Sequence, residues 1–508
     1  MRLRFLSLLS VALCLFAHVP CLTAQSVQEA VSIDARQPAQ PFPHFWEQMF
    51  GSGRAVLSMR ESYRNDLRQV RQITGFRYVR FHAILDDEIG VYGEDRQGKP
   101  IYNFTYVDEI YDGLLANGVK PFVEVSFMPK LLAARLDYHP FWYHPIVSPP
   151  ADYAKWSAMI EAFARHLVDR YGIDEVASWY FEVWNEPNID FWTGRPAQES
   201  YFQLYDNTAR ALKTVSPRIR VGGPATAQAA WVDAMIAHAA QNNIPLDFVS
   251  THAYGNDTAM DILGHAENIP PHQMVAAAVD KVRRQIAASL RPGIPLIWSE
   301  FNATYMSETE ITDSVYMGPW LANTIRECAG KVDMMSYWTF SDVFEEQGVI
   351  QKPFFGGFGL IAIDSLPKPA FNVFKLLHGL GDQQIPLPDS PGSKDVLATK
   401  AKDGTVVLAA WNLVEPGVSA PAKSIQLTLA GVTPDAAIRI DRVDAAHGNV
   451  LAAYDKMGRP QYPTVEQQRQ LRAAAELGPS ERGRLHSGAL TLEIPPQGLA
   501  VVTIAAKR

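Results

Sequence analysis

Between about residues 42 and 380, short apolar segments alternate with longer amphipathic ones, and this alternation constrains the fold more than any other feature. The apolar segments have the length of strands and cover 42–53, 78–85, 120–127, 180–186, 218–224, 248–254, 296–302 and 334–340. The clearest helical segment is 152–171, where Trp156, Ile160 and Phe163 recur at helical spacing. The others cover 57–74, 104–117, 198–215, 229–242, 273–290, 313–329 and 368–377. Eight strands alternating with eight helices predict a (β/α)₈ barrel, which we place at 42–380.

A doubly wound open sheet is the alternative fold for the same pattern. Such a sheet usually carries a nucleotide-binding or nucleophile turn after an early strand, and the sequence has no such turn. The barrel is therefore the favoured prediction.

The character of the chain changes after residue 384. Pro386, Pro388 and Pro391 mark a linker, and short alternating segments follow at 395–401, 405–412, 424–429, 438–444, 489–494 and 500–505. They predict an antiparallel β-sandwich over 384–508, from which the polar segment 457–488 is an excursion. The N-terminal segment 25–41 contains Val31-Ser-Ile33 and is a candidate to add a strand to this sandwich.

Residues 1–24 have the pattern of a secretory signal peptide. Arg2 and Arg4 precede an apolar stretch over 5–16, and Leu22-Thr-Ala24 resembles a cleavage site. A membrane anchor and a lipoprotein signal ending at Cys21 are the weaker alternatives. We expect an exported protein, periplasmic or extracellular, with no membrane association after the signal is removed.

Charge and cysteine content exclude several classes of partner. The formal net charge is −8 and no cluster of basic residues occurs, which argues against a nucleic acid or an anionic membrane. Of the three cysteines, Cys14 and Cys21 lie in the signal segment, so Cys328 has no partner for an internal disulfide. No Cys/His group has zinc-ligand spacing and no phosphate-binding loop is found, so we predict neither a metal nor a cofactor.

Two glutamates stand at the ends of predicted strands. Glu186 follows the fourth strand in the sequence Asn-Glu-Pro, and Glu300 ends Trp-Ser-Glu in the seventh. A glutamate at the end of a buried strand is costly unless it has a task, and barrel active sites lie at the C-terminal strand ends. Two carboxyl groups that face one pocket can cleave a glycosidic bond. Structural acids paired with a buried arginine such as Arg80 are the alternative interpretation.

The motifs around these glutamates resemble those of glycoside hydrolase family 39, the β-xylosidase and α-L-iduronidase family. The matching blocks are His44-Phe-Trp-Glu47 with Gly51-Ser-Gly53, Arg80-Phe-His82, 181–188, Thr251-His-Ala-Tyr254, Ser299-Glu-Phe-Asn302, and 337–346 with 355–359. They occur in order along the barrel, and a C-terminal β-sandwich is also typical of that family.

The resemblance implies a role for each matching residue. Glu186 corresponds to the acid/base, Glu300 to the nucleophile, and Asn185 to the residue that binds the sugar 2-hydroxyl. Tyr254 corresponds to the tyrosine that hydrogen-bonds the nucleophile. The remaining residues implied to lie at or near the sugar are His82, His252, Glu345 and Glu346.

Other side chains are weaker candidates. Four tryptophans could stack on sugar faces, and of these we include Trp338 in the predicted site; the others are Trp46, Trp142 and Trp192. Glu124, within the third strand, is interpreted as a structural core acid.

The chemistry of a retaining glycosidase makes the prediction specific. One carboxyl group must stay protonated near neutral pH while the other is ionised, with the two groups about 5–5.5 Å apart. We expect the higher pKa at Glu186, and ionisation of Glu300 favoured by Tyr254 and Asn302.

The predicted activity is release of β-1,4-linked D-xylose from the non-reducing end of xylo-oligosaccharides. The alternatives are an arabinosidase, an iduronidase, an endo-acting exopolysaccharide hydrolase or a non-catalytic carbohydrate-binding protein. The loop over 252–257 offers no cation for a sugar carboxylate, which favours a neutral sugar. We expect a small oligosaccharide as the partner, and a monomer or a homo-oligomer.

Overall fold

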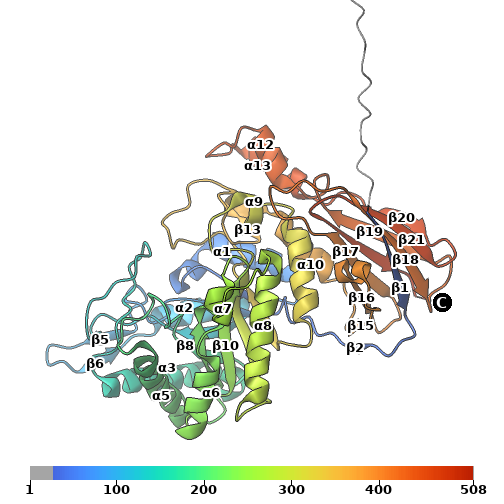
Figure 1. Cartoon of the computed structure of the whole chain (residues 1–508). Helices are drawn as coiled ribbons and strands as arrows, with labels where there is room; N and C mark the ends of the chain where they lie inside the picture. Colours follow the sequence, from blue (N-terminus) through green and yellow to red (C-terminus); the bar gives the residue numbers. More distant parts are fainter. Residues whose placement is uncertain (1–26, 507–508) are drawn as a thin grey trace, which may run out of the picture.

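The computed structural model describes residues 27–506 and contains a closed barrel of parallel strands (Figure 1). Its strands are β3 (Met49–Gly51), β4 (Tyr78–Phe81), β7 (Lys120–Val125), β8 (Tyr180–Val183), β9 (Val221–Thr226), β10 (Phe248–Tyr254), β11 (Leu296–Asn302) and β12 (Met334–Tyr337). Closure occurs where β12 pairs with β3. The predicted (β/α)₈ fold is confirmed, whereas the signal segment 1–24 lies outside the described residues.

Amphipathic helices surround the barrel. They are α1 (Glu61–Ile73), α2 (Thr105–Ala116), α3 (Tyr153–Tyr171), α5 (Ala197–Val215), α6 (Val232–Gln241), α8 (Pro271–Ala288), α10 (Met317–Cys328) and α11 (Pro369–Leu377). In α3 the Asp152 carboxylate caps the first turn, and Gly172, with φ of +80°, ends the helix. No helix in the part of the chain described is long and apolar enough to cross a membrane.

Short elements occupy the loops. They are α4 (Ile173–Val176), α7 (Ala259–Leu263), α9 (Thr309–Thr312), two hairpins formed by β5 (Tyr92–Glu94) with β6 (Pro100–Tyr102) and by β13 (Ile361–Ala362) with β14 (Leu366–Pro367), and the 3₁₀ turns Ala55–Met59, Ala227–Ala229, Ile363–Ser365 and Pro391–Asp395.

Several barrel strands are shorter than predicted. The apolar segment over 42–53 forms a strand only at Met49–Gly51, because Phe45 and Trp46 pack in a buried turn that precedes it. Similarly β8 ends at Val183, so Glu186 stands in the loop beyond the strand. Apolar periodicity reports burial, and these flanking turns are as buried as the strands.

A β-sandwich follows the barrel. One sheet has the order β1 (Val27–Asp34), β18 (Lys423–Ala430) and β21 (Ala489–Ile494). The other has the order β2 (Gln40–Pro41), β15 (Gln383–Gln384), β16 (Val396–Lys400), β17 (Val406–Asn412), β22 (Gly498–Ile504), β19 (Ala437–Val443) and β20 (Glu481–Arg484). The sandwich is antiparallel except where β1 joins β18 in parallel, with Val31 opposite Leu427.

The central strands of the seven-stranded sheet, β16, β17 and β22, are buried on both faces. Along β17, Leu408 and its alternate neighbours pack in the sandwich core, while Val407 and Trp411 belong to the barrel core on the side of helix α10. Successive residues of a strand point to opposite faces, so one strand serves both cores. The sheet is therefore the layer that fixes the sandwich against the barrel (Figure 1).

Two helices project from the sandwich between β19 and β20. They are α12 (Val450–Lys456) and α13 (Val465–Ala475), the second begun by a capping box at Thr464. Leu471 and Tyr454 pack against Phe354 and Leu366, in the segment after β12. The polar excursion predicted at 457–488 thus contains a helix that covers part of the barrel.

Candidate active site

The barrel interior is built in layers. Tyr78, Phe122 and Phe248, near the starts of their strands, belong to an apolar cluster that fills one end. Two residues further along β4 and β7, Arg80 and Glu124 point inward, because alternate residues share a face. The polar layer therefore lies above the apolar one, toward the C-terminal strand ends.

A cavity of about 390 Å³ opens above this polar layer. Its walls come from loops after several strands, and the lining residues are His82, His139, Phe141, Asn185, Glu186, Ile189, Phe191, Ala227, Gln228, Tyr254, Asp257, Glu300, Tyr305, Trp338, Glu346, Gln347 and Phe358. Such a volume suits a small ligand.

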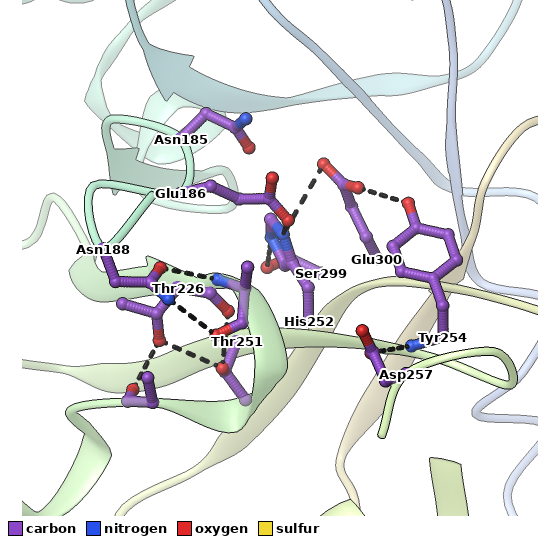
Figure 2. Close-up of polar contacts among 12 residues, drawn as sticks. Asn185, Glu186, Asn188, Thr226, Thr251, His252, Tyr254, Asp257, Ser299 and Glu300 are labelled. Atoms are coloured by element: carbon purple, nitrogen blue, oxygen red, sulfur yellow. Dashed lines mark hydrogen bonds and ion pairs between the residues drawn. The ribbon is translucent and has the colours of Figure 1, made fainter. Parts of the chain in front are cut away.

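Glu186 and Glu300 face each other across this cavity (Figure 2). One oxygen of each carboxyl group lies within 4.8 Å of the other, and the His252 ring nitrogen Nδ1 lies within the same distance of both. His252 Nδ1 is 2.9 Å from Glu186 Oε1 and 3.7 Å from Glu300 Oε1. So close an approach of the two carboxyl groups favours the short spacing of retaining glycosidases over the wider spacing of the inverting class.

The Glu300 carboxylate is held from two sides. The Tyr254 hydroxyl donates to Oε2 at 2.6 Å, and Arg80 Nη1 donates to Oε1 at 2.5 Å. Burial raises the pKa of Glu300, but Arg80 and the hydrogen bond from Tyr254 oppose that rise. Asn302, which the sequence also suggested, instead donates to the Trp338 carbonyl.

Within residues 27–506, neither a lysine nor an arginine forms an ion pair with Glu186. Burial raises its pKa well above the ordinary value for a glutamate, and the charge of Glu300 raises it further. Its backbone has φ of +43°, and Trp184 has φ of +71°. These left-handed residues turn the chain sharply after β8, and the Glu186 amide donates to the Ala225 carbonyl at 2.8 Å, which fixes the turn.

Arg80 organises the polar layer. This fully buried guanidinium contacts Glu124 at 2.8 Å and Glu182 at 2.6 Å, and it donates to Asn185 Oδ1 at 2.9 Å. Three carboxylates, including Glu300, therefore share one arginine. The Asn185 amide is oriented so that its Nδ2 group is left to donate to a ligand, and Glu124 is a core acid, as the sequence suggested.

His82, Glu346 and Trp338 form one side of the cavity. His82 Nδ1 lies 2.7 Å from Glu124 Oε2, and its Nε2 lies 3.6 Å from Glu346 Oε1. Burial raises the pKa of Glu346 to about 8.

The Trp338 ring lies against Gly51, where any side chain would overlap it, so glycine is required there.

Two predicted site residues lie elsewhere. Glu345 does not line the cavity, because Arg54 at 3.2 Å and Arg60 at 2.5 Å hold its carboxylate on another side of the loop. Its neighbour Glu346 lines the cavity instead. His252 is fully buried behind the two glutamates, where its Nε2 contacts Ser299 Oγ at 3.1 Å (Figure 2).

Sequence reasoning missed the aromatic residues His139, Phe141 and Phe191 in the cavity wall. His139 stacks on Phe191 with ring centroids 4.0 Å apart, and Phe141 packs edge-on against the same ring. His139 and Phe141 come from the long segment between β7 and α3, which has no periodicity that could reveal their position. Of the other tryptophans considered, Trp46 and Trp192 are buried in the core.

The group Glu186, His252 and Glu300 is close enough to hold a metal ion. However, the Arg80 guanidinium already occupies the cationic position beside Glu300 and would repel a second cation. The arrangement raises the pKa of Glu186 strongly and places Arg80 and Tyr254 against Glu300 to oppose the rise there, which is the asymmetry that a retaining glycosidase needs.

Comparison with known proteins agrees with this geometry. Residues 29–486 match the family model described as Glycosyl hydrolases family 39. A β-xylosidase of Geobacillus stearothermophilus is 37% identical over 466 residues, which cover 90% of this chain and 91% of that protein. A β-xylosidase of Caldicellulosiruptor saccharolyticus is 34% identical over 91% of this chain and 95% of that protein. The crystal structure of a monomeric β-xylosidase from Caulobacter crescentus superposes with a TM-score of 0.84 at 34% identity, covering 94% of this chain and all of that one.

Proposed function

Because the chain belongs to glycosyl hydrolases family 39, we propose that it is a retaining β-xylosidase that releases xylose from the non-reducing end of xylo-oligosaccharides. The observation that carries the proposal is the pair of carboxyl groups, within 4.8 Å of each other, whose surroundings give them unequal acidity. A double displacement needs this combination.

In the first step, Glu300 attacks the anomeric carbon while Glu186 protonates the glycosidic oxygen. The bond from carbon to the leaving oxygen breaks, a bond to the Glu300 carboxylate forms, and the shortened oligosaccharide departs as an alcohol. Glu186 is suited to this role because its raised pKa keeps the proton available near neutral pH.

In the second step, water replaces the leaving group. Glu186, now ionised, removes a proton from the water as the oxygen attacks the anomeric carbon, and the bond to Glu300 breaks. Neutral xylose leaves and Glu186 is protonated again. His252, whose pKa burial lowers well below its ordinary value, stays uncharged beside Glu186 and fixes the position of that carboxyl group.

We assign sugar binding to the polar residues at the base of the cavity. The Asn185 amide, fixed by Arg80, donates to the 2-hydroxyl, while His82 and Glu346 contact the other hydroxyls and Trp338 supports the ring face. These contacts form a closed base beneath one sugar, which favours cleavage from a chain end.

The charge of the cavity favours a neutral sugar. No lysine or arginine is among the described residues that line it, whereas Asp257 and Glu346 add carboxyl groups to the two catalytic candidates. A uronic acid would bring a further carboxylate without a cation to pair with it. We therefore rank xylose above iduronic acid.

Initial rates on aryl glycosides test the proposal. The substrates are the β-D-xyloside, α-L-arabinoside, β-D-glucoside and α-L-iduronide, each assayed with the wild-type protein and with Glu300→Ala. We expect fast cleavage of the xyloside and loss of nearly all turnover in the variant. If the arabinoside or the iduronide is cleaved faster than the xyloside, the protein is instead an arabinosidase or an iduronidase of the same family.

Cleavage of none of the four would leave two alternatives. Hydrolysis of a long polysaccharide by the wild type alone would indicate an endo-acting enzyme. Equal carbohydrate binding by the wild type and Glu300→Ala, without hydrolysis, would indicate a binding protein.

A further inference from the structure

A second cluster of ligating side chains lies at the other end of the barrel from the active site. Glu47 precedes β3, so it lies at the N-terminal ends of the strands, and His378 ends α11. Glu47 Oε1 is 2.8 Å from His44 Nδ1 and 2.8 Å from His378 Nδ1. The glycosidase chemistry uses none of these residues.

The Glu47 carboxylate is unusual for a buried acid. Its side chain is 2% exposed, yet within the described part of the chain its ion-pair partners are these two histidines, with no lysine or arginine among them. A buried carboxylate normally requires a firm countercharge. The histidines supply one only when protonated, whereas a divalent cation would supply it when they are neutral.

The ligand atoms have the right identity and spacing for zinc. One ligand atom from each of the three residues lies within 4.8 Å of the other two. Two imidazole nitrogens and a carboxylate oxygen are a known zinc ligand set, with bonds of about 2.0–2.2 Å and the fourth position left to water. Tetrahedral bonds of that length separate the ligand atoms by about 3.4 Å, so the present contacts would open by roughly half an ångström.

The surrounding backbone holds the three residues together without an ion. His44 and Glu47 lie in one tight turn, and the Phe42 amide donates to the Asp382 carbonyl at 2.8 Å, which ties that turn to the segment after α11. Pairing of β2 with β15 continues the tie. His378 directly follows α11, and the C-terminal end of a helix favours a cation. His378 is 48% exposed, so an ion has a path inward.

From this geometry we propose that His44, Glu47 and His378 form a zinc-binding site that fastens the entry of the barrel to the segment leading into the sandwich. Nδ1 of each imidazole and one Glu47 oxygen would be the protein ligands. Because both strand β3 and the sandwich linker are joined there, bound zinc stabilises the folded chain according to its concentration relative to the dissociation constant.

Zinc titration of the full chain, stripped of metal and freed of any histidine tag, tests the proposal at pH 7.5. We expect one site per chain by calorimetry, a rise in Tm with added zinc, and the visible absorption bands of tetrahedral cobalt when Co²⁺ replaces zinc. Both His378→Gln and His44→Gln should weaken zinc binding at least about tenfold, while turnover on the aryl xyloside stays unchanged.

His447→Gln is the matched control. His447 is 40% exposed and its Nδ1 lies 2.7 Å from the buried Asp444 carboxylate, but no second histidine was found to complete the group among the described residues. This variant should bind zinc as tightly as the wild type does.

Three results would overturn the proposal. The first is equal zinc affinity in the wild type and His378→Gln. The second is a loss of zinc affinity in His447→Gln as large as that in His378→Gln. The third is zinc binding that survives in His378→Gln but disappears in Glu186→Gln. The last would place the ion at the catalytic glutamates. Because His378 is half-exposed, its replacement should leave the fold intact, and circular dichroism together with retained turnover checks this.

Discussion

At the scale of single residues, the environments of Glu186 and Glu300 separate two chemically identical groups. Arg80 and Tyr254 contact Glu300 directly, whereas the side chain that hydrogen-bonds Glu186 among the described residues is the uncharged His252. The Glu186 side chain is 12% exposed and that of Glu300 is 5% exposed, so the main difference between them lies in their partners. The same polar layer thus provides a nucleophile and an acid.

Tyr254→Phe tests this separation. The substitution removes the hydrogen bond to Glu300 Oε2, and a hydrogen bond to a charged group contributes about 1.5–3 kcal/mol, so kcat/KM should fall roughly 10- to 150-fold. That hydrogen bond lowers the pKa of Glu300, and without it the pKa rises. The acidic limb of the pH profile should therefore move to higher pH.

Tyr305→Phe is the control for this prediction. Tyr305 also lines the cavity, but its hydroxyl makes no hydrogen bond with Glu300. Its acidic limb should coincide with that of the wild type. An unshifted limb in Tyr254→Phe would show that Tyr254 does not tune the nucleophile.

At the scale of elements, the barrel strands and helices could be predicted from periodicity, because their apolar faces repeat at fixed spacing. Strands β10 and β11 occupy the predicted residues, which placed Tyr254 and Glu300 correctly at the strand ends. The loops could not be predicted in this way. Tertiary contacts alone decide that Glu345 pairs with Arg60 outside the cavity. They also decide that His139, from a segment without periodicity, stacks on Phe191 in the cavity wall.

The loop after β12 depends on a buried ion triad. Lys368 Nζ lies 2.6 Å from Asp313 and 2.7 Å from Asp342, with all three side chains buried. The two aspartates accept the amides of Gly356 and Gly359, which flank Phe358 at the cavity.

Lys368→Met should therefore destabilise the protein by about 3–5 kcal/mol, because two buried carboxylates lose their only shared cation. Urea unfolding measures the change. Lys375→Met, at an exposed position of helix α11, which begins directly after Lys368, is the control and should change stability by less than about 0.5 kcal/mol. Equal effects of the two substitutions would contradict the role of the triad.

At the scale of the whole molecule, the sandwich and the barrel share one sheet. The alternation of apolar residues predicted the sandwich strands. It could not show that β17 lies between two cores, with one face covered by the sandwich and the other by the barrel. The strand character of segment 25–41 suggested that it joins the sandwich, as β1 does, but no local pattern predicts its parallel pairing with β18 across nearly 400 positions.

Trp411→Ala tests whether the two parts unfold together. Trp411 is fully buried between β17 and the barrel helices, so its truncation should cost about 3–5 kcal/mol and lower the Tm of a single calorimetric transition. Two separate transitions, with the barrel transition unchanged, would show that the sandwich is an independent unit.

The stereochemistry of the first product tests the central claim most directly. Proton NMR of an aryl β-D-xyloside reaction reports the anomeric configuration of xylose in the first minutes, before mutarotation. A double displacement through Glu300 predicts that β-xylose appears first and α-xylose follows only by mutarotation. If α-xylose forms first, the reaction inverts configuration and the assignment of Glu300 as nucleophile is wrong.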